Sequence, residues 1–356
     1  MDFTEQLRIL QVAQGNPALL ALATVDLAHN ALPAGERTRI KDALVAAAVP
    51  HWCDRDFLTA LLDTTPEEGE RLLSQLRALT AVEPFPARGE HAVNVHEAAR
   101  LALREHLRVT DATRWKALST RARAHVCQGT EFHACIEALY HLFAIDQPAA
   151  AVACEALDRE FTDSGRPEVR HALALALREL TTGGWLTGSA QVEALLAPLR
   201  VRQWRGEGAQ LEAEARDVAD LARTASDPSG IGRTQLLLGD VLETKGRRNE
   251  ALAAFRESLA IFQRLASTDP SNADWQRDLV WAQARVGDVL QAQGQLDEAL
   301  AAFREFLAIA QCLASTDPSN ADWQRDLAIA HDRIGGILQR IFPAHCGERQ
   351  IISEGY

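Results

Sequence analysis

The chain has 356 residues and a formal net charge of −12, with 47% hydrophobic and 24% charged residues, a composition typical of globular proteins. The length predicts about two or three domains, and the negative charge disfavours broad binding to nucleic acid or to an anionic membrane. The N-terminus lacks the basic region of a signal peptide, no uninterrupted apolar run has the length of a membrane span, and the cysteines show no CxxC spacing, so we expect a cytoplasmic chain with reduced thiols.

The N-terminal part of the sequence predicts helices followed by a β-hairpin. Residues 1–30 predict a helix, a turn at Gly15-Asn16-Pro17 and a second apolar helix. Two extended runs at 82–85 and 91–95, joined by Pro-Ala-Arg-Gly, predict the hairpin. Between residue 30 and the hairpin, helices are expected over 37–49, 54–62 and 66–80, the last capped by Thr64 or Thr65. Three helices and a hairpin indicate a winged helix over residues 31–108.

This order resembles the C-terminal part of the nucleotide-binding module in STAND-class signalling NTPases, the group that includes the NB-ARC proteins. The turn Gly15-Asn16-Pro17 is similar to the GxP turn of that family, which implies that Pro17 corresponds to the proline that lies against adenine. The triplet Val95-His96-Glu97 stands where the family has Met-His-Asp, with valine and glutamate as replacements. The resemblance therefore implies that Pro17 and His96 are vestigial nucleotide contacts.

The phosphate-binding half of such a module is missing from the sequence. GxxxxGK[ST] does not occur, so no loop of backbone N–H groups and no lysine are expected for the β and γ phosphates. No Walker-type aspartate follows a strand. We therefore expect neither a cofactor nor ATP hydrolysis, and the chain looks like the back half of a STAND-class protein.

Residues 109–226 predict a succession of helices. Apolar residues recur at helical spacing over 112–127, 131–145, 148–161 and 167–180, with Gly, Pro and Asp at the breaks. This stretch resembles the irregular helical arm that joins the winged helix to the repeats in STAND proteins.

An internal repeat organises the C-terminal part. The sequence LASTDPSNADWQRDL at 265–279 recurs unchanged at 313–327, and the spacing from Gly239 to Gly287 and from Gly287 to Gly335 is 48 residues in both cases. Apolar residues step by three or four within each copy, which predicts a pair of helices. A unit of this length buries its apolar face against neighbouring copies, so the pattern predicts an α-solenoid.

Local signals define the ends of these helices. Gly246 and Gly294 stand where a first helix should end in a left-handed conformation, and Ser271 or Asn272 can cap the next first helix. The third copy holds Gly347 in place of the expected alanine, so residues 323–342 predict a capping helix and 343–356 a flexible tail.

The repeat resembles the tetratricopeptide repeat. Its small and large positions are Leu238, Gly239, Leu242, Ala251 and Phe255, with a second set 48 residues later. The unit is longer than the usual 34 residues of that family, because the second helix and the connection are extended. The resemblance implies a protein-binding array.

Other kinds of site are disfavoured by spacing. His125 with Cys127, and His133 with Cys135, have the ligand types of a zinc site, but residues two apart on a helix point about 200° from each other. No strand-turn-helix elbow supports a serine or cysteine nucleophile. The candidate recognition helix at 66–80 is rich in glutamate and offers only Arg71 and Arg77, which disfavours DNA binding.

The sequence thus predicts an all-α fold with one small hairpin and a non-catalytic role as a protein–protein interaction scaffold or sensor region. The expected parts are a remnant of a nucleotide-module helical subdomain (1–30), a winged helix (31–108), a helical arm (109–226), tetratricopeptide-like repeats (227–342) and the tail (343–356). The rivals are a nucleotide switch completed by a P-loop partner chain and a winged-helix DNA-binding regulator.

We expect the partner to be a protein or peptide bound along a groove of first helices, with self-association as an alternative. The predicted groove residues are Arg233, Asp240, Glu243, Trp281, Asp288, Gln291, Asp332 and Gln339. Acids outnumber bases among them, which favours a basic partner anchored on Trp281. No metal, membrane or nucleic-acid partner is expected.

Overall fold

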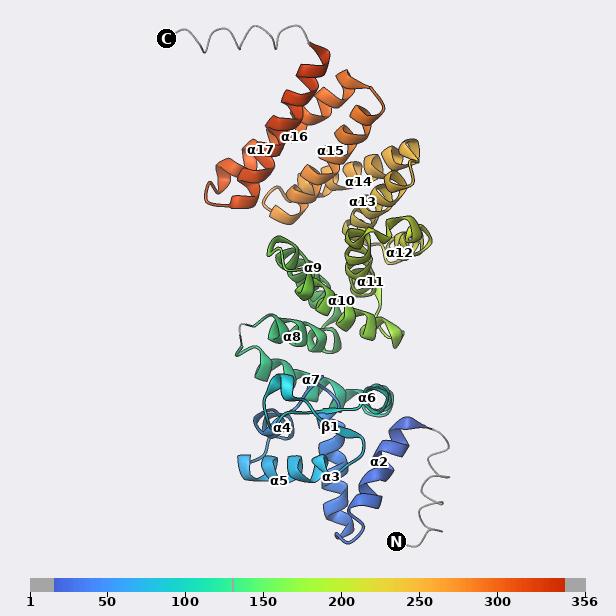
Figure 1. The fold of residues 1–356 in the computed structure, drawn as a ribbon, viewed down its shortest axis with the longest axis vertical. Coiled ribbons are helices and arrows are strands. Elements are labelled where there is room, and N and C mark those ends of the chain that lie inside the picture. The colour runs from blue at the N-terminus through green and yellow to red at the C-terminus, as the bar shows by residue number, and fades with distance from the viewer. Residues whose placement is uncertain (1–15, 130, 343–356) are drawn as a thin grey trace. The chain divides into compact units, whose positions relative to one another are not determined.

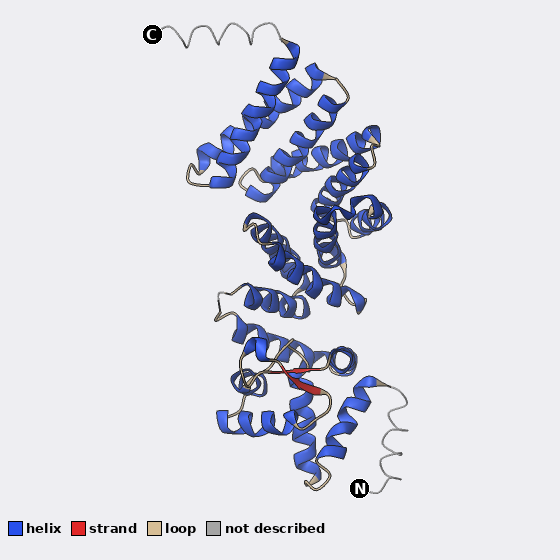
Figure 2. Ribbon diagram, viewed as in Figure 1, coloured by secondary structure: helices blue, strands red, loops and turns tan. Residues whose placement is uncertain are grey.

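The computed structural model describes residues 16–129 and 131–342, which are helical apart from one small hairpin (Figures 1 and 2). The chain divides into two compact units, Met1–Leu186 and Thr187–Tyr356. The division falls within the stretch predicted as a helical arm. The helix expected before Gly15 and the tail 343–356 lie outside the described residues.

The first unit contains the predicted helices and hairpin in the predicted order. Its helices are α2 (Pro17–Ala28), α3 (Ala34–Ala47), α4 (Arg55–Leu62), α5 (Pro66–Arg77), α6 (Glu97–Thr110), α7 (Ala112–Val126), α8 (Phe132–Ile145), α9 (Gln147–Asp163) and α10 (Pro167–Thr182). The strands are β1 (Val82–Pro84) and β2 (Val93–Val95), with the short 3-10 helix η1 (Pro86–Arg88) between them. The strands pair antiparallel, with Val82 opposite Val95.

Side-chain caps begin several of these helices, and the cap of α5 is one that the sequence predicted. The Asn16 carboxamide oxygen accepts the Ala18 N–H at 2.9 Å and starts α2, with Pro17 in its first turn. Of the two threonines proposed for α5, Thr65 is the cap. A single apolar core joins α2 to α7 and includes the fully buried Phe57 and Leu73.

The second unit contains the repeats. Its elements are α11 (Gly188–Arg202), η2 (Gln203–Glu207), η3 (Gly208–Gln210), α12 (Glu212–Thr224), α13 (Pro228–Thr244), α14 (Arg248–Thr268), α15 (Ala273–Ala292), α16 (Leu296–Thr316) and α17 (Ala321–Ile341). Consecutive helices from α13 to α17 pack on one another. We call α13, α15 and α17 the first helices of the repeats, and α14 and α16 the second helices (Figure 1).

The repeated sequence produces the same local structure twice. Asn272 and Asn320 are the caps of α15 and α17, each accepting two backbone N–H groups. In both connections a serine hydroxyl donates to the aspartate two residues earlier at 2.6 Å. Gly246 and Gly294, which end α13 and α15, have φ of 73° and 80°, as predicted from the steric freedom of glycine.

Each hairpin closes through a glycine against a phenylalanine. A Cβ atom at Gly239 would lie 2.3 Å from Phe255, and one at Gly287 would lie 2.5 Å from Phe303. Both phenylalanines are fully buried. A Cβ at Gly335 would meet no atom within 4 Å among the described residues. The first two copies are thus close-packed hairpins, and the third is a single helix, α17, over the residues described.

By length and composition alone, α16 is the one described helix that is apolar enough to cross a membrane. In the structure it packs between α15 and α17. Its Phe303 and Phe306 are buried in the core of the repeats. Contact with two neighbouring helices accounts for the apolar character of α16.

Candidate functional site

The predicted groove residues occupy three neighbouring first helices, but they are not equally exposed. Trp281 on α15 is 41% exposed, whereas Arg233, which stands 48 residues earlier on α13, is only 4% exposed. The Arg233 guanidinium donates to the Glu193 carboxylate of α11 at 2.6 Å. A buried charge requires such a partner. Arg233 therefore contributes to the interior of the unit and not to an exposed surface.

The acids at the centre of the row are paired with arginines of the next first helix. The Asp240 carboxylate lies 3.1 Å from Arg285, and the Asp288 carboxylate lies 3.2 Å from Arg333. The two ion pairs are related by the 48-residue period. The sequence analysis did not select Arg285 and Arg333, although each lies 45 residues after its aspartate in the repeated register.

These pairings change the electrostatics predicted for the row. Partial burial raises the pKa of Asp240, an effect that the nearby Arg285 opposes. Burial likewise raises the pKa of Asp288, against the influence of Arg333 and Arg285. The excess of acid predicted from the sequence is therefore largely neutralised by arginines that bridge successive first helices.

The remaining predicted residues lie around these pairs. Glu243 and Gln291 are half-buried near the ends of α13 and α15, and Asp332 and Gln339 are exposed on α17. Burial also raises the pKa of Glu243. Neither Glu243 nor Asp332 forms an ion pair with another described residue.

Two exposed apolar side chains stand at equivalent positions of successive first helices. Ile329 of α17 follows Trp281 by 48 residues and is 38% exposed. Large apolar side chains exposed at a repeated position are typical of an interaction surface. The repeat period was the signal that could have selected Ile329 from the sequence. The surface thus combines exposed apolar side chains with ion pairs.

The residues with an implied nucleotide role are exposed at helix starts. Pro17 lies in the first turn of α2, and His96 is the residue before α6. The His96 backbone N–H donates to the Ala81 carbonyl at 2.8 Å, which ties the end of the hairpin to the segment before β1. Helices α2 and α6 pack on each other. The described contacts give His96 a structural role at the start of α6.

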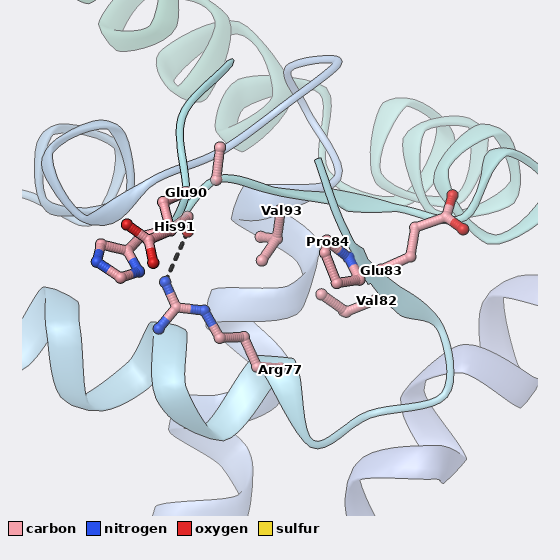
Figure 3. A pocket seen from close by; sticks show the side chains of 8 residues that line it. Arg77, Val82, Glu83, Pro84, Glu90, His91 and Val93 are labelled. Atoms are coloured by element: carbon pink, nitrogen blue, oxygen red, sulfur yellow. Dashed lines mark hydrogen bonds between the residues drawn. The ribbon is translucent and has the colours of Figure 1, made fainter. Parts of the chain in front are cut away.

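The arginines of the predicted recognition helix are already engaged within the fold. Arg77 donates to the His91 carbonyl at 2.6 Å, across a hollow of about 260 Å³ beside the hairpin (Figure 3). Arg71 is paired with Glu68 at 2.6 Å and Glu36 at 2.9 Å. These contacts occupy the cations that a phosphate backbone would need.

Comparison with known proteins supports the repeat. Residues 232–264, which cover most of α13 and α14, match the family model of the tetratricopeptide repeat. No curated protein sequence matches the chain. Among solved structures, the chain is similar to a Signal Transduction ATPase with Numerous Domains (STAND) protein with a tetratricopeptide repeat sensor from Pyrococcus horikoshii, at 11% identity and a TM-score of 0.31. That alignment covers 97% of this chain but spans 64% of the other protein.

Proposed function

We propose that this chain is a non-catalytic interaction or sensor region of a STAND-like signalling protein, and that it binds a protein partner through the first helices of its repeats. The observation that carries the proposal is the exposure of Trp281 and Ile329 at one repeated position of a tetratricopeptide-type array. Neighbouring first helices present these side chains at a regular interval, as recognition of an extended or helical peptide requires.

The ion pairs support a more specific proposal for the chemistry of the partner. Because Arg285 and Arg333 neutralise Asp240 and Asp288, apolar contact supplies most of the affinity. We therefore propose an amphipathic peptide with apolar side chains on Trp281 and Ile329. Any basic residue of the peptide would pair with Glu243 or Asp332 at the ends of the row, where charge adds specificity more than affinity.

The N-terminal part enters the proposal through the order of its elements. The helices α2 to α5, the hairpin and the helices after it resemble in their order the winged helix and helical arm of STAND-class proteins. In this interpretation residues 31–108 form a packing and regulatory module, and the protein acts in the cytoplasm. The engaged Arg71 and Arg77 favour this reading over DNA binding.

Selection from a displayed random-peptide library tests the proposal with the intact chain as bait. The enriched peptides are titrated against the parent chain and against the variants Trp281→Ala and Ile329→Ala. The matched control is Trp204→Ala, because Trp204 is an exposed tryptophan of the same unit that lies outside the first helices. Circular dichroism verifies that each variant is folded.

We expect Trp281→Ala to weaken peptide binding by about 2 kcal/mol, the usual loss for an aromatic anchor, and Trp204→Ala to leave it unchanged. Equal affinity of the parent and both first-helix variants would exclude this face as the binding surface. Sedimentation analysis of the same variants distinguishes self-association, which Trp281→Ala would abolish if a second copy occupied the face.

A further inference from the structure

The first unit contains a cavity of about 680 Å³ that the repeat-based function does not use. It is formed by side chains of α6, α8 and α10, together with the segment after α3 and the turn between the strands. Its volume is in the range of small-molecule sites. All of its lining residues belong to the first unit.

One wall of the cavity is a buried network of charged side chains. The Glu137 carboxylate accepts from the His51 backbone N–H at 3.0 Å, and its other oxygen lies 2.7 Å from His51 Nδ1. His141 Nε2 lies 3.1 Å from the same carboxylate. Burial would raise the pKa of Glu137, but the two histidines outweigh it and hold that pKa well below its usual range. Glu137 is thus an ionised carboxylate whose partners are all internal.

The second carboxylate of this wall, Glu179, is largely covered and is held by two arginines. It accepts from Arg100 at 2.8 Å, from Tyr140 at 3.0 Å and also from Arg104. Burial opposes ionisation, but His51, Arg104 and Arg100 lower the pKa of Glu179. The two guanidinium groups outnumber this one carboxylate, while Glu137 beside it is paired with His51 and His141.

One hydrogen-bond donor of Arg100 is unsatisfied by the described residues. It lines the cavity and is only 8% exposed, and no described residue accepts a hydrogen bond from its Nε–H. A buried donor without an acceptor costs free energy. The Nε atom is covered by its neighbours, so a bound anion would accept from it after a small shift of the Arg100 side chain toward the cavity.

Two further arginines contribute positive charge to the lining. Arg178 of α10 is exposed and forms no ion pair with any described residue. Arg88 lies over the Trp52 ring at 5.6 Å, and its nearest carboxylate, that of Glu131, is 4.0 Å away. The acid outside the internal network is Glu97, which is exposed in the first turn of α6. The lining thus holds three arginines and three carboxylates, but Glu137 and Glu179 are engaged by internal partners, which leaves Arg88 and Arg178 against one further carboxylate, Glu97.

The other wall of the cavity is apolar. Trp52 and Phe85 supply aromatic surface, Leu101 and Ile136 supply aliphatic surface, and Leu175 is exposed at the opening. Ligand sites usually combine such apolar walls with a few convergent polar groups. Guanidinium groups match the geometry of carboxylate and phosphate oxygens in particular.

We propose that this cavity binds a small organic anion, a carboxylate or phosphate monoester carried on an aromatic or aliphatic body. The head group accepts from Arg100 and pairs with Arg88 and Arg178, and the body lies against Trp52 and Phe85. The site goes beyond the proposed interaction role, because it gives the first unit a small-molecule input that is independent of the repeats.

Isothermal titration of the full chain with simple probes tests this site. The probes are phenyl phosphate and 3-phenylpropionate, with neutral 3-phenylpropionamide as the matched compound that lacks the charge. We expect saturable binding of at least one anion and an affinity for the amide at least about tenfold lower. Which anion binds more tightly distinguishes a phosphate from a carboxylate ligand.

Variants at the opening locate the binding. Arg178→Gln and Leu175→Glu alter exposed positions, so the fold should tolerate them. Each should lower the affinity for the anion by about tenfold. The control variant Arg39→Gln, at an exposed position outside the cavity, should leave the affinity unchanged. Thermal unfolding checks that all three variants are folded. Absence of saturable binding at millimolar concentration, equal affinity for the amide, or unchanged affinity in both opening variants would overturn the proposal.

Discussion

Gly287 offers a direct test of the repeat packing, because its Cα lies against the fully buried ring of Phe303. An alanine Cβ there would lie 2.5 Å, 2.8 Å and 2.9 Å from three carbon atoms of the Phe303 ring. Ordinary carbon–carbon contacts are about 3.5 to 4.0 Å. Phe303 is fully buried in α16, so the ring or the helix must shift by roughly 1 Å to relieve the overlap.

Two opposing effects set the size of the change. Overpacking of this kind typically costs about 1 to 3 kcal/mol, while replacing a glycine by alanine inside a helix stabilises it by about 0.5 to 1 kcal/mol. At Gly335 only the second effect operates, because no described atom lies within 4 Å of the added carbon. The free energies of unfolding of Gly287→Ala and Gly335→Ala should therefore differ by about 1 to 3 kcal/mol.

The comparison is made by thermal unfolding monitored by circular dichroism. For a unit of this size about 1 kcal/mol corresponds to a Tm shift of about 2 to 4 °C. Hydrogen exchange of peptides from α15 and α16 assigns the change to the repeats. We expect Gly335→Ala to raise the Tm slightly and Gly287→Ala to have a lower Tm than Gly335→Ala. If Gly287→Ala unfolds at the same temperature as Gly335→Ala or higher, close packing of the hairpin is refuted.

Glu193→Gln should destabilise the second unit by about 3 kcal/mol in urea unfolding, because it removes the carboxylate that pairs with the buried Arg233. The double variant Glu193→Leu with Arg233→Met removes both charges and should change the stability little. The pH dependence of stability should change in His51→Gln: burial lowers the pKa of His51, but Glu137 outweighs this and raises it. The His51 contribution is therefore complete below its ordinary pKa of about 6.5 and is lost as the pH rises through the folded-state value. Between about pH 6 and pH 9 the free energy of unfolding of the parent should fall by the His51 contribution, whereas that of His51→Gln should not. The control variant His91→Gln, at an exposed position, should lose stability over this range as the parent does. Calorimetric titration with ATP or ADP and magnesium should show binding no tighter than millimolar, because the sequence has no P-loop lysine; micromolar affinity would reveal a phosphate site of another kind.

Much of the secondary structure could be predicted from the sequence because its causes are local. The caps at Thr65, Asn272 and Asn320 depend on a side chain and backbone groups two or three residues away. The left-handed ends at Gly246 and Gly294 depend on the steric freedom of a single residue. An unchanged stretch of sequence accordingly produced the same connection twice.

The candidate sites depended on contacts between distant segments. The same repeat position holds a buried Arg233, paired with Glu193 of α11, and an exposed Trp281. The charge balance of Asp240 was decided by Arg285, on the next first helix. In the first unit, His51 meets Glu137, 86 residues later in the chain. The sequence determined which side chains carry charge, but the tertiary packing decided which charges meet, because burial and ion pairing depend on distances between helices that no local pattern specifies.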